Sequence, residues 1–167
     1  MTLKTVFLGM AIASCGLFAQ PSISKEAMQA YTGIKNNLTK LADKVPEDTY
    51  GYKPTDSIRT LGQLIGHVAD ANLRTCSAVN GELKPATAGK MTAKADLVGA
   101  LKASFDECDK AFGTLTDANL ADVIKTPRGE RSRLSSLLGI VVHGNEEYGY
   151  MAVYLRMKGI VPPSSEK

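Results

Sequence analysis

Four long segments of this chain repeat apolar residues every three or four positions, which is the spacing of one face of an α-helix. In the first segment, over 24–44, that face consists of Ala27, Tyr31, Ile34, Leu38 and Leu41. No segment shows the sustained apolar–polar alternation that indicates a half-buried strand. A helix with one apolar face must bury it against another element. The pattern therefore predicts an all-α fold, a four-helix bundle.

Residues that favour helix ends separate the four segments. Pro46 ends the first helix. The second begins near Ser57 or Thr60 and ends near Gly81, the third has Thr92 as its N-cap and ends at Gly113, and the fourth begins after Ser132 and ends at about Lys158. Between the third and fourth helices we expect a short helical turn over 116–124. A turn is then expected at the sequence PRG of 127–129.

The first nineteen residues have the three parts of a secretory signal peptide. Lys4 supplies the positive end, residues 5–18 are apolar or small without charge, and Ala19 precedes polar sequence. We expect cleavage after Ala19, which leaves 20–167 as the folded domain, exported to the periplasm or out of the cell. The alternative is lipidation at Cys15, in the lipobox-like sequence IASC at 12–15. Without that lipid, we expect no membrane association after cleavage.

The composition excludes several kinds of site. Removal of 19 of the 167 residues leaves 148, with two histidines and two cysteines. Two histidines are too few for a three-histidine metal site within one subunit, and three cysteines in the whole chain are too few for a four-cysteine zinc site. A net charge of only +3 and the absence of tryptophan argue against a nucleic-acid partner.

The two mature cysteines, Cys76 and Cys108, constrain the helix directions. An oxidising compartment favours a disulfide between them. If the second and third helices were antiparallel, the cysteines would differ in height by roughly 15 Å, whereas a disulfide needs Cα atoms within about 7 Å. Parallel helices place both near one end, and the connection of about eleven residues can span up to about 37 Å. An up-down-down-up bundle bridged by Cys76 and Cys108 is therefore self-consistent. Two buried free thiols are the alternative.

Both histidines of the chain lie in the middle of predicted helices. His67 shares its helix face with Leu64 and Ala71, and Glu147 stands four residues after His143 on one face of the fourth helix. We expect all three side chains to point inward, where a carboxylate is costly unless it is paired or bound to metal. Two imidazoles and one carboxylate suit a divalent transition metal. Hydrogen-bonded core histidines and a plain His–Glu ion pair are the alternatives.

Three arginines, Arg128, Arg131 and Arg133, cluster just before the predicted fourth helix. A solvated turn followed by a helix start explains such a cluster in most proteins. An anion-binding site is the alternative.

The sequence resembles the DinB/YfiT-like superfamily over nearly all of 24–163. The resemblance rests on LGQLIGHVAD at 61–70 and HGNEEYG at 143–149, and the ending YLRMKGIVPP at 154–163 is similar to that of a secreted bacterial branch. It implies an up-down-down-up bundle and a divalent metal held by three histidines, at positions that match His67, His143 and Glu147. Glu147 departs from the family pattern. The resemblance thus implies either a two-histidine, one-glutamate site for zinc, nickel, iron or manganese, or a degenerate site.

Characterised members of that superfamily include S-transferases that use small bacterial thiols. The resemblance therefore implies a metal-dependent enzyme of hydrolase or thiol S-transferase type, which acts on a small molecule that the sequence does not identify. Four residues are expected near the metal without an assigned catalytic role, namely Asp70, Asn145, Glu146 and Tyr154. The alternative is a non-catalytic helical binding or stress-associated module. Some relatives form dimers along the bundle, which implies a homodimer here.

Overall fold

Four α-helices form the bundle that the apolar spacing predicted. The computed structural model describes residues 21–126 and 129–166, so the predicted leader of residues 1–19 lies outside the described residues. The helices are α1 (Ile23–Lys44), α2 (Leu61–Val79), α3 (Lys94–Gly113) and α4 (Arg133–Met157). None of these helices is both long and apolar enough to cross a membrane. The predicted fold class, an all-α four-helix bundle, is confirmed.

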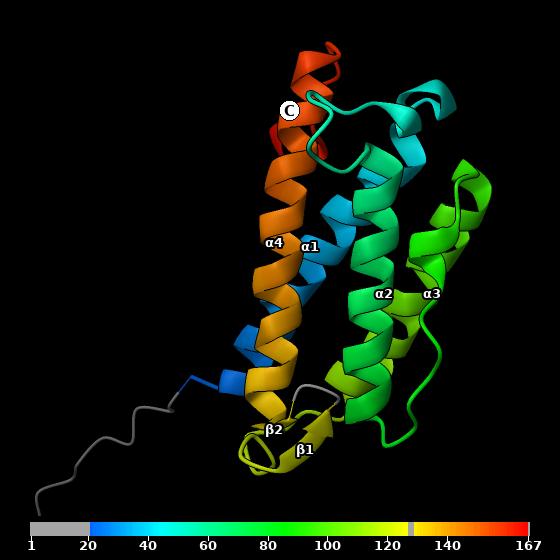
Figure 1. Cartoon of the computed structure of the whole chain (residues 1–167). Helices are drawn as coiled ribbons and strands as arrows, with labels where there is room; N and C mark the ends of the chain where they lie inside the picture. Colours follow the sequence, from blue (N-terminus) through cyan, green and yellow to red (C-terminus); the bar gives the residue numbers. More distant parts are fainter. Residues whose placement is uncertain (1–20, 127–128, 167) are drawn as a thin grey trace, which may run out of the picture.

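The helix directions follow the predicted up-down-down-up order. In Figure 1, α1 and α4 run upward, whereas α2 and α3 run downward. The connection between α2 and α3, residues 80–93, climbs back along the outside of the bundle before α3 begins. Short 3-10 turns lie in the connections and near the C-terminus, at η1 (Glu47–Gly51), η2 (Ala88–Lys90) and η3 (Pro163–Ser165).

Side-chain caps set the starts of three helices. The hydroxyl of Ser22 accepts a hydrogen bond from the Lys25 amide at α1, and that of Ser132 accepts from the Ser135 amide at α4. At α2, Thr60 and Gln63 form a capping box, in which each side chain bonds the backbone amide of the other.

The predicted cap of the third helix was wrong by one residue. The N-cap is Ala93, which offers no side-chain hydrogen bond, rather than Thr92. The first helical residue, Lys94, instead donates its ammonium to the carbonyl oxygens of Asp43 and Val45 at the end of α1. A contact between two helix ends holds this position, and sequence spacing does not reveal such a contact.

The region between α3 and α4 matches the predicted helical turn over 116–124 only in part. The amides of Asn119 and Asp122 bond the carbonyls three residues earlier, and the chain then enters a strand. Strand β1 (Val123–Thr126) pairs antiparallel with β2 (Gly129–Ser132), with Ile124 opposite Arg131. Ile124 is the only buried residue of the two strands. Strands of four residues with a single buried side chain carry too little alternation to be recognised by period. The hairpin closes the lower end of the gap between α2 and α4 (Figure 1).

A carboxylate of α2 holds the climbing connection in place. Asp70 accepts hydrogen bonds from the amides of Ala88 at 2.7 Å and Gly89 at 3.0 Å. One turn earlier, Gly66 lets the backbone approach, because a Cβ atom there would lie 2.7 Å from the Ala88 carbonyl oxygen. Asp70 therefore anchors the connection, and its charge also acts on the His67 imidazole, whose pKa it tends to raise.

The core includes the predicted disulfide between α2 and α3. Cys76 and Cys108 are joined, with their Cα atoms 4.9 Å apart, and both are fully buried. Between α1 and α3, the ring of Tyr31 stacks on Phe112 with centroids 4.0 Å apart. The Tyr31 hydroxyl donates to Asp109 at 2.7 Å, and burial raises the pKa of this phenol. The parallel course of α2 and α3 brings the two cysteines to one height, as the sequence argument required.

Candidate metal centre

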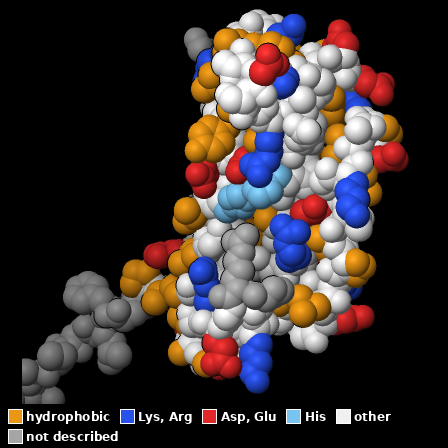
Figure 2. All heavy atoms as spheres, viewed as in Figure 1, with side chains coloured by type: hydrophobic (Ala, Val, Ile, Leu, Met, Phe, Trp, Pro, Cys, Tyr) orange, Lys and Arg blue, Asp and Glu red, His pale blue; other side chains and the backbone are white. Residues whose placement is uncertain are grey.

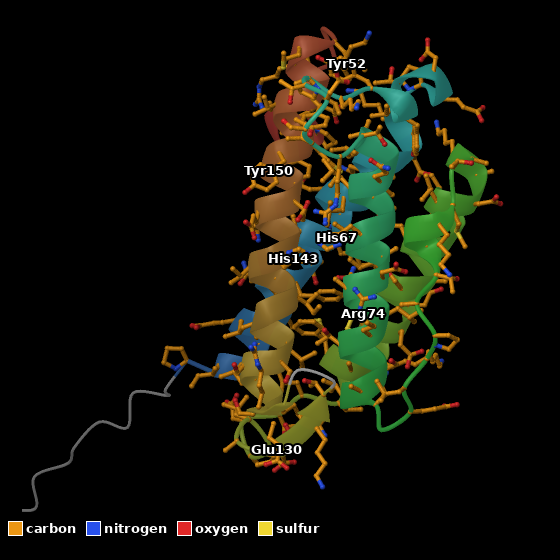
Figure 3. The ribbon with its side chains drawn as sticks, viewed as in Figure 1. Tyr52, His67, Arg74, Glu130, His143 and Tyr150 are labelled. Atoms are coloured by element: carbon orange, nitrogen blue, oxygen red, sulfur yellow. A yellow bond between two sulfur atoms is a disulfide. The ribbon has the colours of Figure 1, made fainter. Side chains whose placement is uncertain are left out.

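The three predicted ligands meet between α2 and α4. His67 comes from α2, and His143 and Glu147 stand one turn apart on α4. One ligand atom of each residue lies within 4.8 Å of the other two. Figure 3 shows the two histidines side by side across the gap between these helices, and their ring centroids are 5.0 Å apart at 86°. The i, i+4 spacing on α4 and the crossing of α2 at His67 together create this group.

The Glu147 carboxylate lies close to both imidazoles. Its Oε1 atom lies 3.6 Å from Nε2 of His67 and 3.9 Å from Nδ1 of His143. The carboxylate side chain is only 6% exposed, whereas the histidine side chains are 28% and 27% exposed. The sequence predicted three inward side chains. In the structure only Glu147 is fully buried, and the histidines lie at the boundary with solvent.

The uncharged forms of Glu147 and His67 are favoured. Burial raises the pKa of the Glu147 carboxyl, against the opposing effects of His143 and Arg59. Burial, followed by the charges of Arg59, His143 and Arg74, lowers the pKa of the His67 imidazole. Neutral imidazole is the form that binds metal ions. His67 is therefore ready to act as a ligand near neutral pH.

The donor set fits a divalent metal ion. The second carboxylate oxygen of Glu147, Oε2, is buried without a hydrogen-bond partner, which is costly for an ionised carboxylate unless a cation compensates it. Ligand atoms on one tetrahedral ion at about 2.0–2.2 Å lie roughly 3.5 Å apart, close to the Glu147–histidine separations. Two nitrogens and one oxygen match the three-ligand sets of catalytic zinc sites, which leave a coordination position open.

A cavity of about 220 Å³ opens beside the two histidines. Residues of α2, α4 and the hairpin line the cavity, namely His67, Ala71, Arg74, Thr75, Thr126, Arg131, Ser136, Gly139, Ile140 and His143. Of these lining residues, only the two histidines and Arg131 were candidate binding residues from the sequence. Helical spacing could have indicated two others. Arg74 is seven residues after His67, and Ser136 is seven residues before His143, so each lies on the same helix face as its histidine.

The other residues expected near the metal have different contacts. The Tyr154 hydroxyl donates to the Arg59 carbonyl at 3.0 Å, and the Asn145 amide donates to the Val141 carbonyl at 2.8 Å. Glu146 lies on the exposed side of α4, where its Oε1 atom accepts a hydrogen bond from the Tyr150 hydroxyl at 3.1 Å and its Oε2 atom lies 3.9 Å from Nδ1 of His143. These contacts stabilise the local structure.

The predicted arginine cluster is divided by the fold. Arg131 lines the cavity, whereas Arg133 begins α4 and lines a separate depression beside the end of α2. Arg128 lies outside the described residues. Of the two described arginines, Arg131 is thus the one that lines the cavity beside the candidate metal centre.

Comparisons with known proteins agree with this architecture. The sequence model of the DinB superfamily matches residues 30–151, a range that contains all three candidate ligands. A DinB-like protein of Bacillus cereus has a similar structure with a TM-score of 0.70 at 18% identity, over 85% of this chain and 96% of that one. A conserved protein of Enterococcus faecalis has a TM-score of 0.65 at 15% identity, over 83% and 98% of the two chains. A search of curated proteins found no match.

Proposed function

Because the chain belongs to the DinB superfamily, which is associated with metal binding, we propose that it binds one divalent transition metal through His67, His143 and Glu147. The observation that carries the proposal is the buried Oε2 atom of Glu147, which has no hydrogen-bond partner beside two imidazoles. A divalent cation compensates this carboxylate and uses both imidazole lone pairs. Zinc, nickel, iron and manganese all suit the donor set.

We propose further that the site supports hydrolysis of a small molecule. A divalent metal lowers the pKa of a bound water and so supplies a nucleophile near neutral pH. In the net hydrolysis, the water oxygen would bond to the electrophilic atom of the substrate, the bond from that atom to the leaving group would break, and the leaving group would take one proton of the water. His67, His143 and Glu147 would hold the ion. The Glu147 carboxylate is buried, whereas the two histidines line the cavity through which a substrate would approach. A thiol S-transferase is the second reaction type that such a site suits.

The disulfide favours hydrolysis over thiol transfer. Cys76 and Cys108 are bridged, which is typical of proteins in oxidising compartments, whereas small thiols are kept reduced mainly inside the cell. Together with the leader-like start of the sequence, this supports export of the mature chain. Mass spectrometry of protein from a bacterial periplasm tests the proposal directly: a mature N-terminus at Gln20 supports cleavage after Ala19, and a lipidated Cys15 contradicts it.

Metal analysis tests the binding proposal. We expect about one equivalent of metal per chain in protein isolated from the periplasm or reconstituted after chelation. The variants His67→Ala, His143→Ala and Glu147→Gln should each lose at least about tenfold in affinity. Asp106→Asn is the control, because it removes an exposed carboxylate of α3 and should bind as the wild type does. Glu147→His, which introduces the residue that the resemblance implies, should retain binding.

The contrary result is equally clear. Less than about 0.1 equivalent after reconstitution, in a chain with unchanged helical content, would overturn the metal site. The non-catalytic binding module would then be the better description.

A further inference from the structure

Two arginines face the cavity beside the candidate metal centre without an acidic partner. Arg74 and Arg131 line the cavity, and neither guanidinium forms an ion pair or hydrogen bond with any residue in the described parts of the chain. Other cations of this protein are paired, as shown by Lys35 with Asp109, Lys84 with Glu107 and Lys102 with Asp43. The two arginines are thus free to bind a ligand.

No carboxylate among the described residues lines this cavity. Asp70 lies one turn before Arg74, but two backbone amides of the climbing connection occupy its carboxylate. Glu147 is buried, whereas the histidines are partly exposed to solvent. In Figure 2, basic side chains lie on the same face as the pale-blue histidines, above and below them. The cavity therefore favours a negatively charged guest.

The walls carry hydrogen-bonding groups as well as charge. Thr75 contributes a hydroxyl from α2, whereas the Ser136 hydroxyl of α4 already donates to the Ser132 carbonyl at 3.0 Å. Ala71 and Gly139 keep the space between the helices open. A Cβ atom added at Gly139 would meet nothing within 4 Å. The volume of about 220 Å³ corresponds to roughly seven waters of liquid. It admits a small molecule and excludes a folded polymer.

The two ends of the cavity differ in chemistry. Arg74 follows His67 by two helical turns, so their Cα atoms are about 10 Å apart along α2. Arg131 comes from the hairpin at the same lower end. A guanidinium presents a planar fork that binds carboxylate or phosphate oxygens in pairs. The arginine end suits an oxyanion, and the histidine end suits a reacting group.

We propose that Arg74 and Arg131 bind the carboxylate or phosphate group of a small anionic substrate, so that the other end of that molecule reaches His67 and His143. The location of the reacting end rests on the proposed metal-dependent function. The anion subsite itself does not, because the two arginines are present without a metal.

Calorimetric titration of the metal-free mature protein tests the subsite. Succinate and inorganic phosphate are the probes, and a pH near 8 keeps the His67 imidazole, whose pKa is lowered, neutral. We expect saturable binding of at least one of them, weakened by added sodium chloride because the contacts are ionic. Repetition with the nickel-loaded protein shows whether a metal strengthens the binding.

Substitutions separate the arginines from general charge. Arg74→Gln and Arg131→Gln should each weaken binding about tenfold, and the double variant should abolish it, since each removes a charged fork. Arg74→Lys should recover part of the loss because it keeps the charge and loses the fork. Lys40→Gln is the control, because it removes one positive charge from an exposed position of α1. Gly139→Leu should block the cavity, whereas Gly149→Leu, at an exposed glycine of the same helix, should not.

The possible outcomes distinguish this proposal from the metal site. Binding that is unchanged in the double arginine variant, or no binding of either anion to the folded metal-free protein, overturns the subsite. Anion binding only to the nickel-loaded form, insensitive to both arginines, overturns it too, because the metal alone would then hold the anion. Loss of metal binding in His67→Ala with unchanged succinate affinity supports the subsite.

Discussion

Two adjacent glutamates of α4 show how position on a helix decides the role of identical side chains. Glu147 is 5% exposed and lies between the two histidines, whereas Glu146 is exposed and bonds Tyr150. Neighbouring helical residues point about 100° apart. Only Glu147 therefore faces α2, and only Glu147 has a desolvated carboxylate that a metal ion would compensate.

Glu147→Gln should stabilise the metal-free protein while it weakens metal binding. A neutral amide costs less to bury than a carboxylate with a buried oxygen that has no partner, so we expect the free energy of unfolding to rise by about 1 kcal/mol. Glu146→Gln should change it by less than about 0.5 kcal/mol. Urea unfolding of chelator-treated protein measures both. A less stable Glu147→Gln variant would show that the histidines alone compensate the carboxylate.

A second buried carboxylate, Glu107 of α3, predicts acid sensitivity. Hydrogen bonds from Lys84 and Asn80, both at 2.6 Å, hold the pKa of Glu107 below its ordinary value. A lowered carboxyl pKa contributes stability above the unfolded pKa of about 4.3 and loses it as pH falls through the folded pKa.

Glu107→Gln should therefore destabilise the protein by about 1 kcal/mol near pH 7. The difference from wild type should be smaller at pH 3 than at pH 7, because the stability that a lowered carboxyl pKa contributes is lost progressively as pH falls below about 4.3. Asp106→Asn, at the adjacent exposed acid, serves as the control and should show little difference at either pH. Urea titrations at both pH values measure the effect, and a pH-independent difference would contradict it.

At the scale of elements, glycines in the two site helices have opposite surroundings. Gly66 of α2 packs against the connection to α3, where an added Cβ would lie 2.7 Å from the Ala88 carbonyl oxygen. Gly139 of α4 faces the open cavity, where an added Cβ would meet nothing within 4 Å. The first glycine permits close packing of the chain, and the second keeps a space empty.

Alanine at these positions should have opposite effects on stability. Gly66→Ala should lower the free energy of unfolding by about 1–3 kcal/mol, because the carbonyl of a packed backbone must move. Gly139→Ala should raise it by about 0.5–1 kcal/mol, because alanine favours the helix and meets no obstacle. Thermal and urea unfolding of the two variants measure the difference. If both variants were more stable than the wild type, helix propensity alone would explain the results. If both were less stable, crowding alone would explain them.

At the scale of the whole molecule, the disulfide connects the two helices that run in the same direction. Cys76 and Cys108 are 32 residues apart, and the loop between them contains the whole climbing connection. Two parallel helices need this long crossover, whereas an antiparallel pair would need only a short turn. The bridge therefore restricts the segment with the largest freedom in the unfolded chain.

The Cys76→Ala/Cys108→Ala double variant should be less stable by about 3–4 kcal/mol, the entropy of closing a loop of this length. The far-ultraviolet circular dichroism of the folded variant should stay the same, because each helix has its own caps and core face. Urea unfolding with and without a reducing agent measures the effect, and the double variant should no longer respond to the reductant. A loss much below about 1 kcal/mol would indicate that the reduced unfolded chain already stays compact.

The sequence by itself determined the four helices, and it favoured a pairing of two cysteines that is consistent with the helix directions of the structure. Long stretches with a repeated apolar face specify helices strongly, and the separation of Cys76 from Cys108 restricts the topology. The positions of His67, His143 and Glu147 could also be predicted, since i, i+4 spacing and the resemblance to a family both indicate them. The hairpin Val123–Ser132 could not, because its strands are short and bury only Ile124.

Only the tertiary structure decided what surrounds the histidines. It assigned Asp70 to the climbing connection and brought Arg74 of α2 and Arg131 of the hairpin to one cavity. It also left the two histidine side chains partly exposed to solvent beside the buried Glu147. These outcomes depend on contacts between residues far apart in the chain. Local spacing specifies which face of a helix a residue occupies, but the packing of α2, α4 and the hairpin decides which side chains meet and where space remains.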